Sequence, residues 1–105
     1  MDEHVPRWEP APFDTAVIER DDSGALVLTV KGVAPSHGER SLGARLVPHP
    51  ADDAEYARVE VELDRADALF LSEWPYTVAL PLDGVAGTKG VEVVGRDGSV
   101  TVALP

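Results

Sequence analysis

Hydrophobic and polar residues alternate along much of this chain with the two-residue period of β-strands. The clearest case is residues 56–64, where Val59, Val61 and Leu63 alternate with charged residues. This pattern predicts a strand with one face in the core and the other in water. Similar segments predict about eight strands in all, over residues 15–20, 25–31, 42–47, 56–64, 68–71, 76–80, 91–94 and 99–104.

Turn-forming residues divide these segments. Asp21-Asp22-Ser23-Gly24 and Gly95-Arg96-Asp97-Gly98 each predict a tight hairpin, because glycine supplies the positive φ that such turns need. Residues 32–41 predict a loop, and Pro48-His49-Pro50 predicts a break. No segment keeps helical periodicity for as long as three turns. Residues 51–58 are the best candidate for a helix, which would be brief. The expected fold is all-β, an antiparallel β-sandwich of about 7–8 short strands, such as an immunoglobulin-like one.

A chain of 105 residues has room for one compact domain. Residues 1–12 contain three prolines among charges, which predicts an extended N-terminal arm that Trp8 could pin to the body. Residues 13–105 are then expected to form the single sandwich domain.

The acidic balance narrows the function classes. Nineteen acidic residues against nine basic ones give a formal net charge of -10, which repels nucleic acids and anionic membrane surfaces. The chain has no cysteine, which rules out disulfides and thiolate chemistry. No hydrophobic stretch has the length of a membrane span or follows a basic segment, so a cytoplasmic location is expected. Asparagine and glutamine are absent and lysine is rare, which we interpret as the coding bias of a GC-rich bacterial genome.

The last third of the chain resembles the Hsp20 (α-crystallin) domain family and its HSP20-like relatives. The matching features are Leu80-Pro81, Gly84-Val85, the Asp97-Gly98 turn and a final strand ending in Leu104-Pro105. Val93, Ser99 and Val100 depart from the residues usual in that family, and no Ile-x-Ile tail follows Pro105. The resemblance implies an HSP20-like sandwich with chaperone-like or adaptor-like binding, but not the large oligomers that such tails build.

Two groups of polar residues are candidates for chemical sites. Ser36, His37, Glu39 and Arg40 gather the ingredients of acyl transfer in the expected loop, but neighbours in an extended segment point apart, so a polar surface or binding loop is favoured. His49, Asp52, Asp53 and Glu55 match no EF-hand spacing, so a solvated acidic turn is favoured. We therefore expect no catalytic residue, no metal and no cofactor.

Aromatic and valine-rich segments are the candidates for a partner surface. Phe70, Trp74 and Tyr76 are the main aromatic concentration, and burial at a sandwich corner is favoured over an exposed patch for Trp74 and Tyr76. Val91 and Val93 are placed on an exposed strand edge in this hypothesis. The charged face of Glu60, Glu62 and Asp64 is interpreted as solvated, as protection of an edge strand, or as a patch for a basic partner.

These observations favour a non-enzymatic protein-interaction module, chaperone-like or adaptor-like, that binds a protein partner or client through an exposed strand edge. A monomer or a dimer is expected, without nucleic-acid or membrane binding. Two alternatives stay open. One is a small-ligand-binding or catalytic accessory protein with a pocket between the sheets or under residues 32–41. The other is a structural subunit of a larger assembly.

Overall fold

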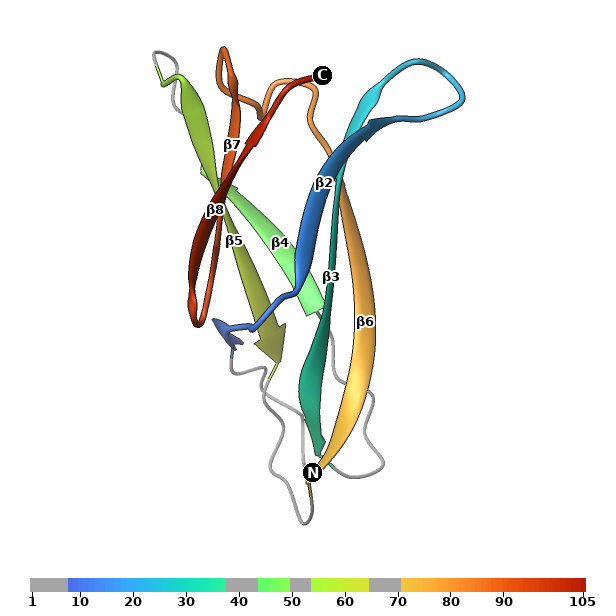
Figure 1. The fold of residues 1–105 in the computed structure, drawn as a ribbon, viewed down its shortest axis with the longest axis vertical. Coiled ribbons are helices and arrows are strands. Elements are labelled where there is room, and N and C mark those ends of the chain that lie inside the picture. Colours follow the sequence, from blue (N-terminus) through green and yellow to red (C-terminus); the bar gives the residue numbers. More distant parts are fainter. Residues whose placement is uncertain (1–7, 38–43, 50–53, 65–70) are drawn as a thin grey trace, which may run out of the picture.

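The computed structural model describes residues 8–37, 44–49, 54–64 and 71–105. These residues form eight strands: β1 (Trp8–Pro10), β2 (Thr15–Arg20), β3 (Leu26–His37), β4 (Ala44–His49), β5 (Tyr56–Asp64), β6 (Leu71–Pro81), β7 (Gly90–Gly95) and β8 (Gly98–Ala103). The strands lie in two facing layers (Figure 1), which confirms the predicted β-sandwich. Within the described ranges, no helix is long and apolar enough to cross a membrane.

The larger sheet, sheet A, has five strands built around β5. β4 pairs antiparallel with residues 58–63 of β5. β7 pairs with residues 56–60 and β1 with residues 62–64, so these two strands follow one another along the opposite edge of β5. β8 pairs with the outer edge of β7 and ends the sheet. The smaller sheet, sheet B, has the order β2-β3-β6.

One pairing differs from the antiparallel expectation, because β5 and β7 run parallel. The chain leaves sheet A after β5, crosses sheet B as β6 and returns as β7. Two reversals of direction bring β7 back alongside β5 with the same orientation. A strand of the opposite sheet therefore makes the crossover that a helix makes in α/β folds.

Several predicted boundaries are wrong for identifiable reasons. The loop expected at residues 32–41 is strand as far as His37, since β3 pairs with β6 over its whole length. β4 continues through Pro48 and His49, because proline is tolerated on a strand that pairs along one edge only. The helix expected over residues 51–58 is absent from residues 54–58, where β5 begins at Tyr56.

The N-terminal segment is extended, as expected, but its described part belongs to the sandwich. Trp8–Pro10 pairs with β5, and the Ala11 N–H donates to the Val61 carbonyl at 2.8 Å. Ala11 is fully buried. The ring of Trp8 lies 3.8 Å from the Arg45 guanidinium, which ties β1 to β4. Residues 1–7 of the predicted arm lie outside the described residues.

The core lies between the two sheets and follows the alternation of the strands. Leu28 and Val30 of β3 face the β5 and β7 valines, and all of them are fully buried: Val59, Val61, Val91 and Val93. Their partners in register share their face, so the inner side of each sheet is apolar. The centre of the sandwich is thus filled by aliphatic side chains from both sheets.

The predicted turn between β2 and β3 is confirmed. Gly24 has φ 87°, which other residues rarely adopt. One carboxylate oxygen of Asp21 accepts hydrogen bonds from the Ser23 N–H, the Ser23 hydroxyl and the Ala25 N–H, at 2.9, 2.6 and 3.0 Å. The Ser23 hydroxyl, followed by these backbone donors, holds the pKa of Asp21 below its usual range.

Candidate functional site

The sandwich has two long sides, each made by one edge strand from each sheet. β4 lies near β6 on one side and β2 lies near β8 on the other. We call the outer edges of β4 and β6 the proline side, and the outer edges of β2 and β8 the open side. A strand edge exposes unpaired N–H and C=O groups that another chain can bind. The residues along each edge therefore decide which side can accept a further strand.

Prolines interrupt both edges of the proline side. In β6, the Leu82 N–H donates to the Leu26 carbonyl at 3.0 Å, so even-numbered residues bond to β3 and odd-numbered ones face outward. Pro75 and Pro81 are odd-numbered and remove donors from the free edge. In β4, Pro48 lies opposite Val59 and has no N–H to donate to β5, so it belongs to the residues that face the free edge. It therefore removes a donor from the free edge of β4.

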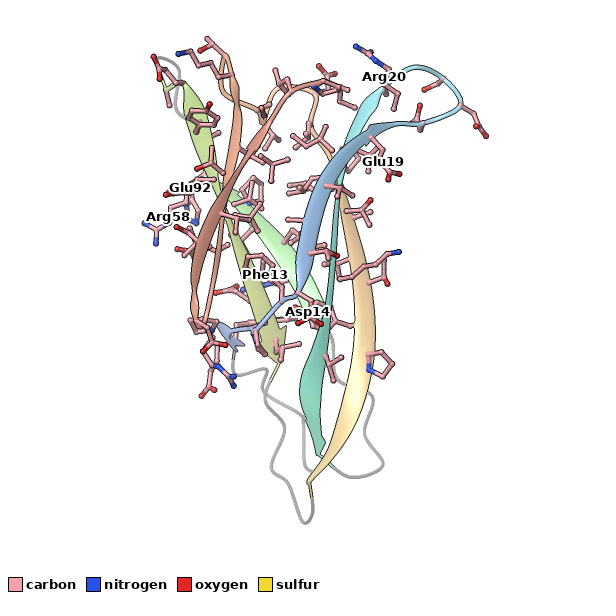
Figure 2. The ribbon with its side chains drawn as sticks, in the orientation of Figure 1. Phe13, Asp14, Glu19, Arg20, Arg58 and Glu92 are labelled. Atoms are coloured by element: carbon pink, nitrogen blue, oxygen red, sulfur yellow. The ribbon has the colours of Figure 1, made fainter. Side chains whose placement is uncertain are left out.

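β8, on the open side, has none of these protections. Its sequence, Gly-Ser-Val-Thr-Val-Ala, contains no proline and no charge. Every residue of β8 is exposed except Val102, which is half-buried. β2 also lacks proline but ends in the charged pair Glu19 and Arg20 (Figure 2). Among the described strands, β8 is thus the best template for strand addition.

The hydrogen-bonding phase of β8 follows from its hairpin. Gly95 and Gly98 flank a two-residue turn and form a bonded pair, so alternate residues of β8 bond to β7. Beyond the far end of β8, the Leu104 N–H donates to the Lys89 carbonyl at 2.8 Å, so there too the even-numbered residue bonds toward β7. Ser99, Thr101 and Ala103 therefore direct their N–H and C=O groups to the free edge.

Val100 marks the point where the core opens to solvent. It pairs with Val93 and shares its inward face. Val93 is fully buried, whereas Val100 is 45% exposed. An inward-facing valine is exposed here because sheet B does not cover this part of β8. An apolar side chain on an added strand would complete the coverage.

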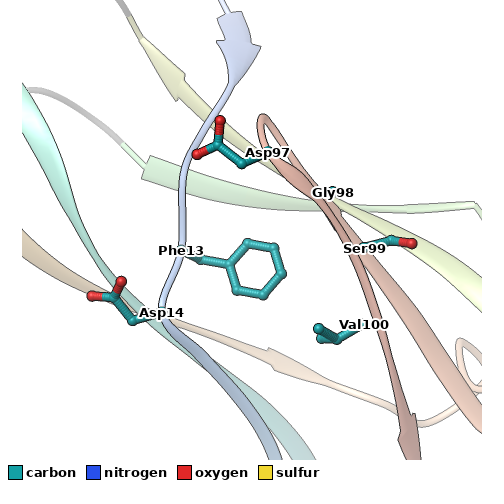
Figure 3. Close-up of a pocket in the computed structure, with 6 residues that line it drawn as sticks. All are labelled: Phe13, Asp14, Asp97, Gly98, Ser99 and Val100. Carbon is teal, nitrogen blue, oxygen red and sulfur yellow. The ribbon is translucent and has the colours of Figure 1, made fainter.

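A small cleft begins beside Val100 at the start of β8 (Figure 3). It has a volume of about 190 Å³ and is lined by Phe13, Asp14, Asp97, Gly98, Ser99 and Val100. We call it the Phe13 cleft. The Phe13 ring lies in the gap between β8 and β2, and the Asp14 and Asp97 carboxylates lie at its rim. The cleft combines an aromatic wall with an open backbone edge.

Tyr76 holds the segment that carries Phe13. Its hydroxyl donates to the Pro12 carbonyl, and its ring passes over Gly32 of β3, where a Cβ atom would lie 2.8 Å from the hydroxyl. Burial, and secondarily the Asp14 carboxylate, raises the pKa of Tyr76 to about 12. The neutral phenol therefore fixes Pro12 and the neighbouring Phe13 against the sandwich.

Gly95 and a backbone hydrogen bond from Arg96 complete the support of Phe13. A Cβ atom on Gly95 would lie 2.6 Å from the Phe13 ring, so only glycine admits the ring at this position. The Arg96 N–H donates to the Ala11 carbonyl at 2.9 Å and joins the β7–β8 turn to the same segment. The wall of the cleft is thus held by β3, β6 and the turn before β8.

The prediction that Val91 and Val93 lie on an exposed strand edge is wrong. β7 pairs with β5 and β8 along its two edges, and Val91 and Val93 are fully buried, so Val91–Val94 has no free edge. Tyr76 is 5% exposed, as the favoured interpretation expected. Trp74 lies in β6 opposite Ala34, and Phe70 lies outside the described residues.

The predicted loop site is not a loop in its described part. Ser36 and His37 lie at the end of β3, opposite Ser72 and Leu71, while Glu39 and Arg40 lie outside the described residues. The residues that the sequence interpretation missed are Phe13, Val100 and Thr101. The absence of charge and proline from Gly98–Ala103 was the available signal for Val100 and Thr101, whereas no local signal pointed to Phe13.

Two carboxylates on the outer face of β5, those of Glu60 and Glu62, lie beside basic side chains. Glu62 Oε1 lies 2.9 Å from Arg45 Nη2, and the two Glu60 oxygens lie 3.1 Å from Arg58 Nη2 and 3.4 Å from His49 Nε2. β5 has partners on both edges, so its carboxylates do not protect an edge strand.

Metal ligation has no support in the described ranges, where no group of three His, Cys, Asp or Glu residues could hold an ion. Glu55 lies 3.4 Å from the Lys89 ammonium, and Asp52 and Asp53 fall outside these ranges.

Comparison of the chain with protein-family models, with curated proteins and with solved structures found no match. The resemblance of the last third to Hsp20 domains therefore stays a prediction.

Proposed function

We propose that this protein is a non-enzymatic protein-interaction module that binds an extended segment of a partner along the free edge of β8. The observation that carries the proposal is that β8 is exposed, uncharged and free of proline, whereas three prolines interrupt the edges on the other side. Backbone hydrogen bonds supply affinity in strand addition, and pockets for alternate side chains supply specificity. The edge groups of Ser99, Thr101 and Ala103 are the proposed backbone contacts.

The side-chain contacts of the proposal lie on the inward face. An added strand places every second side chain beside Val100 and Val102, and the Phe13 cleft receives an apolar side chain at one end. Asp14 and Asp97 at the rim favour a partner without acidic residues at that position. The partner is thus a segment with alternating apolar residues and few acidic ones.

The test uses peptides selected for binding from a random nine-residue library on the dilute protein. Thr101→Pro removes an outward donor without removing a bond to β7, so we expect selected peptides to lose at least about tenfold in affinity. Thr77→Pro is the matched control, because Thr77 is an exposed threonine in the outward phase of β6. We expect it to bind like the unaltered protein, and bound peptide to slow amide exchange at Ser99, Thr101 and Ala103. Equal binding by the folded Thr101→Pro protein would refute the proposal.

Chaperone-like binding is the form of this function that the Hsp20 resemblance implies. We expect the protein to reduce light scattering from a heat-unfolding client, relative to an equally acidic inert protein. Thr101→Pro should lose this effect and Thr77→Pro should keep it. Suppression that Thr101→Pro retains would place client binding elsewhere on the molecule, and no suppression would leave the adaptor-like form.

A further inference from the structure

The order of residues along β8 is nearly the same in both directions about Thr101. Val100 and Val102 flank Thr101, and the small residues Ser99 and Ala103 follow on either side. When a strand pairs antiparallel with a copy of itself about a twofold axis, each residue meets its mirror position in the copy. Centred on Thr101, such pairing places valine opposite valine and serine opposite alanine.

The hydrogen-bonding phase of β8 agrees with this centre. Thr101 directs its N–H and C=O groups away from β7, as the even-numbered phase shown by Leu104 and Lys89 requires. Two copies related at Thr101 therefore exchange both hydrogen bonds between their threonines. Ser99 and the partner's Ala103 do the same on each side. A centre at Val100 would still pair outward-facing residues, Ser99 with the partner's Thr101, but it would place the partner's Leu104 opposite Arg96 instead of Gly98.

The inward face gains coverage at the same register. Val100, which is 45% exposed, comes to lie beside the partner's Val102. Since the ladder continues to Leu104, the partner's Leu104 meets Gly98, whose missing side chain leaves the Phe13 cleft open. A second copy thus provides the apolar side chain that this cleft lacks.

Charge acts on this pairing at two levels. The two β8 strands do not repel one another, but the two whole molecules do. β8 has no charged residue, so no like charges meet across the new ladder. Glu92, the outward neighbour of Thr101, lies one strand further in on β7. Each chain carries a net charge of -10, however, so association should strengthen as salt screens this repulsion.

We propose that two copies of this chain join through antiparallel pairing of β8 with β8, with the twofold axis at Thr101 and the partner's Leu104 in the Phe13 cleft. This inference rests on the proposed function, because it names a second copy as one occupant of the β8 edge. The pairing merges the two five-stranded sheets into one continuous sheet. It also makes self-association compete with any other partner strand.

A single introduced cysteine tests the axis directly, because the chain has no cysteine of its own. In Thr101→Cys the two thiols meet at the axis, at a Cα separation of about 5.5 Å that a disulfide can span. We expect mild oxidation to give a linked dimer at least about tenfold faster than in Thr77→Cys, the control on the proline side. Sedimentation equilibrium of the unaltered protein should show a monomer–dimer equilibrium that salt shifts toward dimer.

A charge placed on the inward face of the edge gives a second measurement. Val100→Lys brings an ammonium against the partner's Val102, and we expect dimerisation to weaken by at least about tenfold while the fold is retained. The proposal is overturned if the protein stays monomeric at every concentration and salt level, or if Thr77→Cys links as fast as Thr101→Cys. If the selected peptides still protect Ser99 and Thr101 in a monomeric protein, only the dimer fails. If no peptide binds the edge either, the proposed function fails with it.

Discussion

The two long sides of this sandwich use the same geometry with different residues. On the proline side, Pro48, Pro75 and Pro81 remove donors from the free edges of β4 and β6. On the open side, β8 keeps every outward donor and has no charge to repel another strand. Edge strands that are left unprotected pair with other chains, and many proteins protect them for this reason. The contrast indicates that one side of this molecule is closed to pairing and the other is available for it.

The largest effect is expected for a substitution in β7, because the comparison of the two sides requires β7 to lie inside sheet A. Val93→Asp places an unpaired charge in the packed core, which costs several kcal/mol against a domain stability of about 5–15 kcal/mol. We expect loss of the cooperative urea transition followed by circular dichroism. Val17→Asp is the control, because Val17 is 41% exposed on the outer face of β2, and it should change stability by about 0.5 kcal/mol or less. A folded Val93→Asp protein with a normal midpoint would place β7 at an edge after all.

The next effect concerns the support of the open side. Tyr76→Phe removes the hydrogen bond to the Pro12 carbonyl and should cost about 1–2 kcal/mol. The pKa of Tyr76 is raised to about 12, above the unfolded value near 10, so its contribution is present below pH 10. That contribution is lost as the pH rises from 10 to about 12. The free energy of unfolding, measured by urea at each pH, should fall less steeply over this range in Tyr76→Phe.

Tyr56→Phe is the control for that measurement, because the Tyr56 side chain is 36% exposed. It should leave the free energy of unfolding at neutral pH close to that of the unaltered protein. Equal slopes in the Tyr76→Phe and unaltered proteins would show that Tyr76 is not the group responsible.

Removing the prolines should weaken the contrast between the two sides. Pro75→Thr combined with Pro81→Thr restores two outward donors on β6. We expect stronger self-association, by about tenfold in the dissociation constant measured by sedimentation. Thr101→Pro in the same background separates the two edges, since it should leave only the new association through β6. An unchanged dissociation constant would mean that the prolines are not what closes this side.

The smallest effect is expected at the contact between β1 and β4. Arg45→Met removes the guanidinium that lies over Trp8 and beside Glu62, and should lower stability by about 0.5–1 kcal/mol. The measurement is urea unfolding followed by tryptophan fluorescence. Arg58→Met is the control, because Arg58 pairs with Glu60 and is not part of the Trp8 contact. If both variants lose the same free energy of unfolding, the contact between Arg45 and Trp8 does not contribute to stability.

The candidate site shows the limit of prediction from local pattern. The valines of Val91–Val94 and those of β8 look alike as apolar strand residues. Only the order β5-β7-β8 buries the first group on both edges and exposes the second. Phe13 reaches the open side because Tyr76 holds a segment 64 positions earlier in the chain. No short window of sequence contains that contact.

The sequence by itself determined most of the strands and both hairpin turns, because alternation, glycine and aspartate act over a few residues. β2 and β5 have the predicted bounds, and Gly24 and the Asp97-Gly98 turn lie where the hairpins were expected. Only the tertiary structure decided that β7 is central, that β5 and β7 run parallel and that β8 is a free edge. Strand order depends on contacts between residues far apart in the chain, and the period of a strand is the same at the centre of a sheet as at its edge.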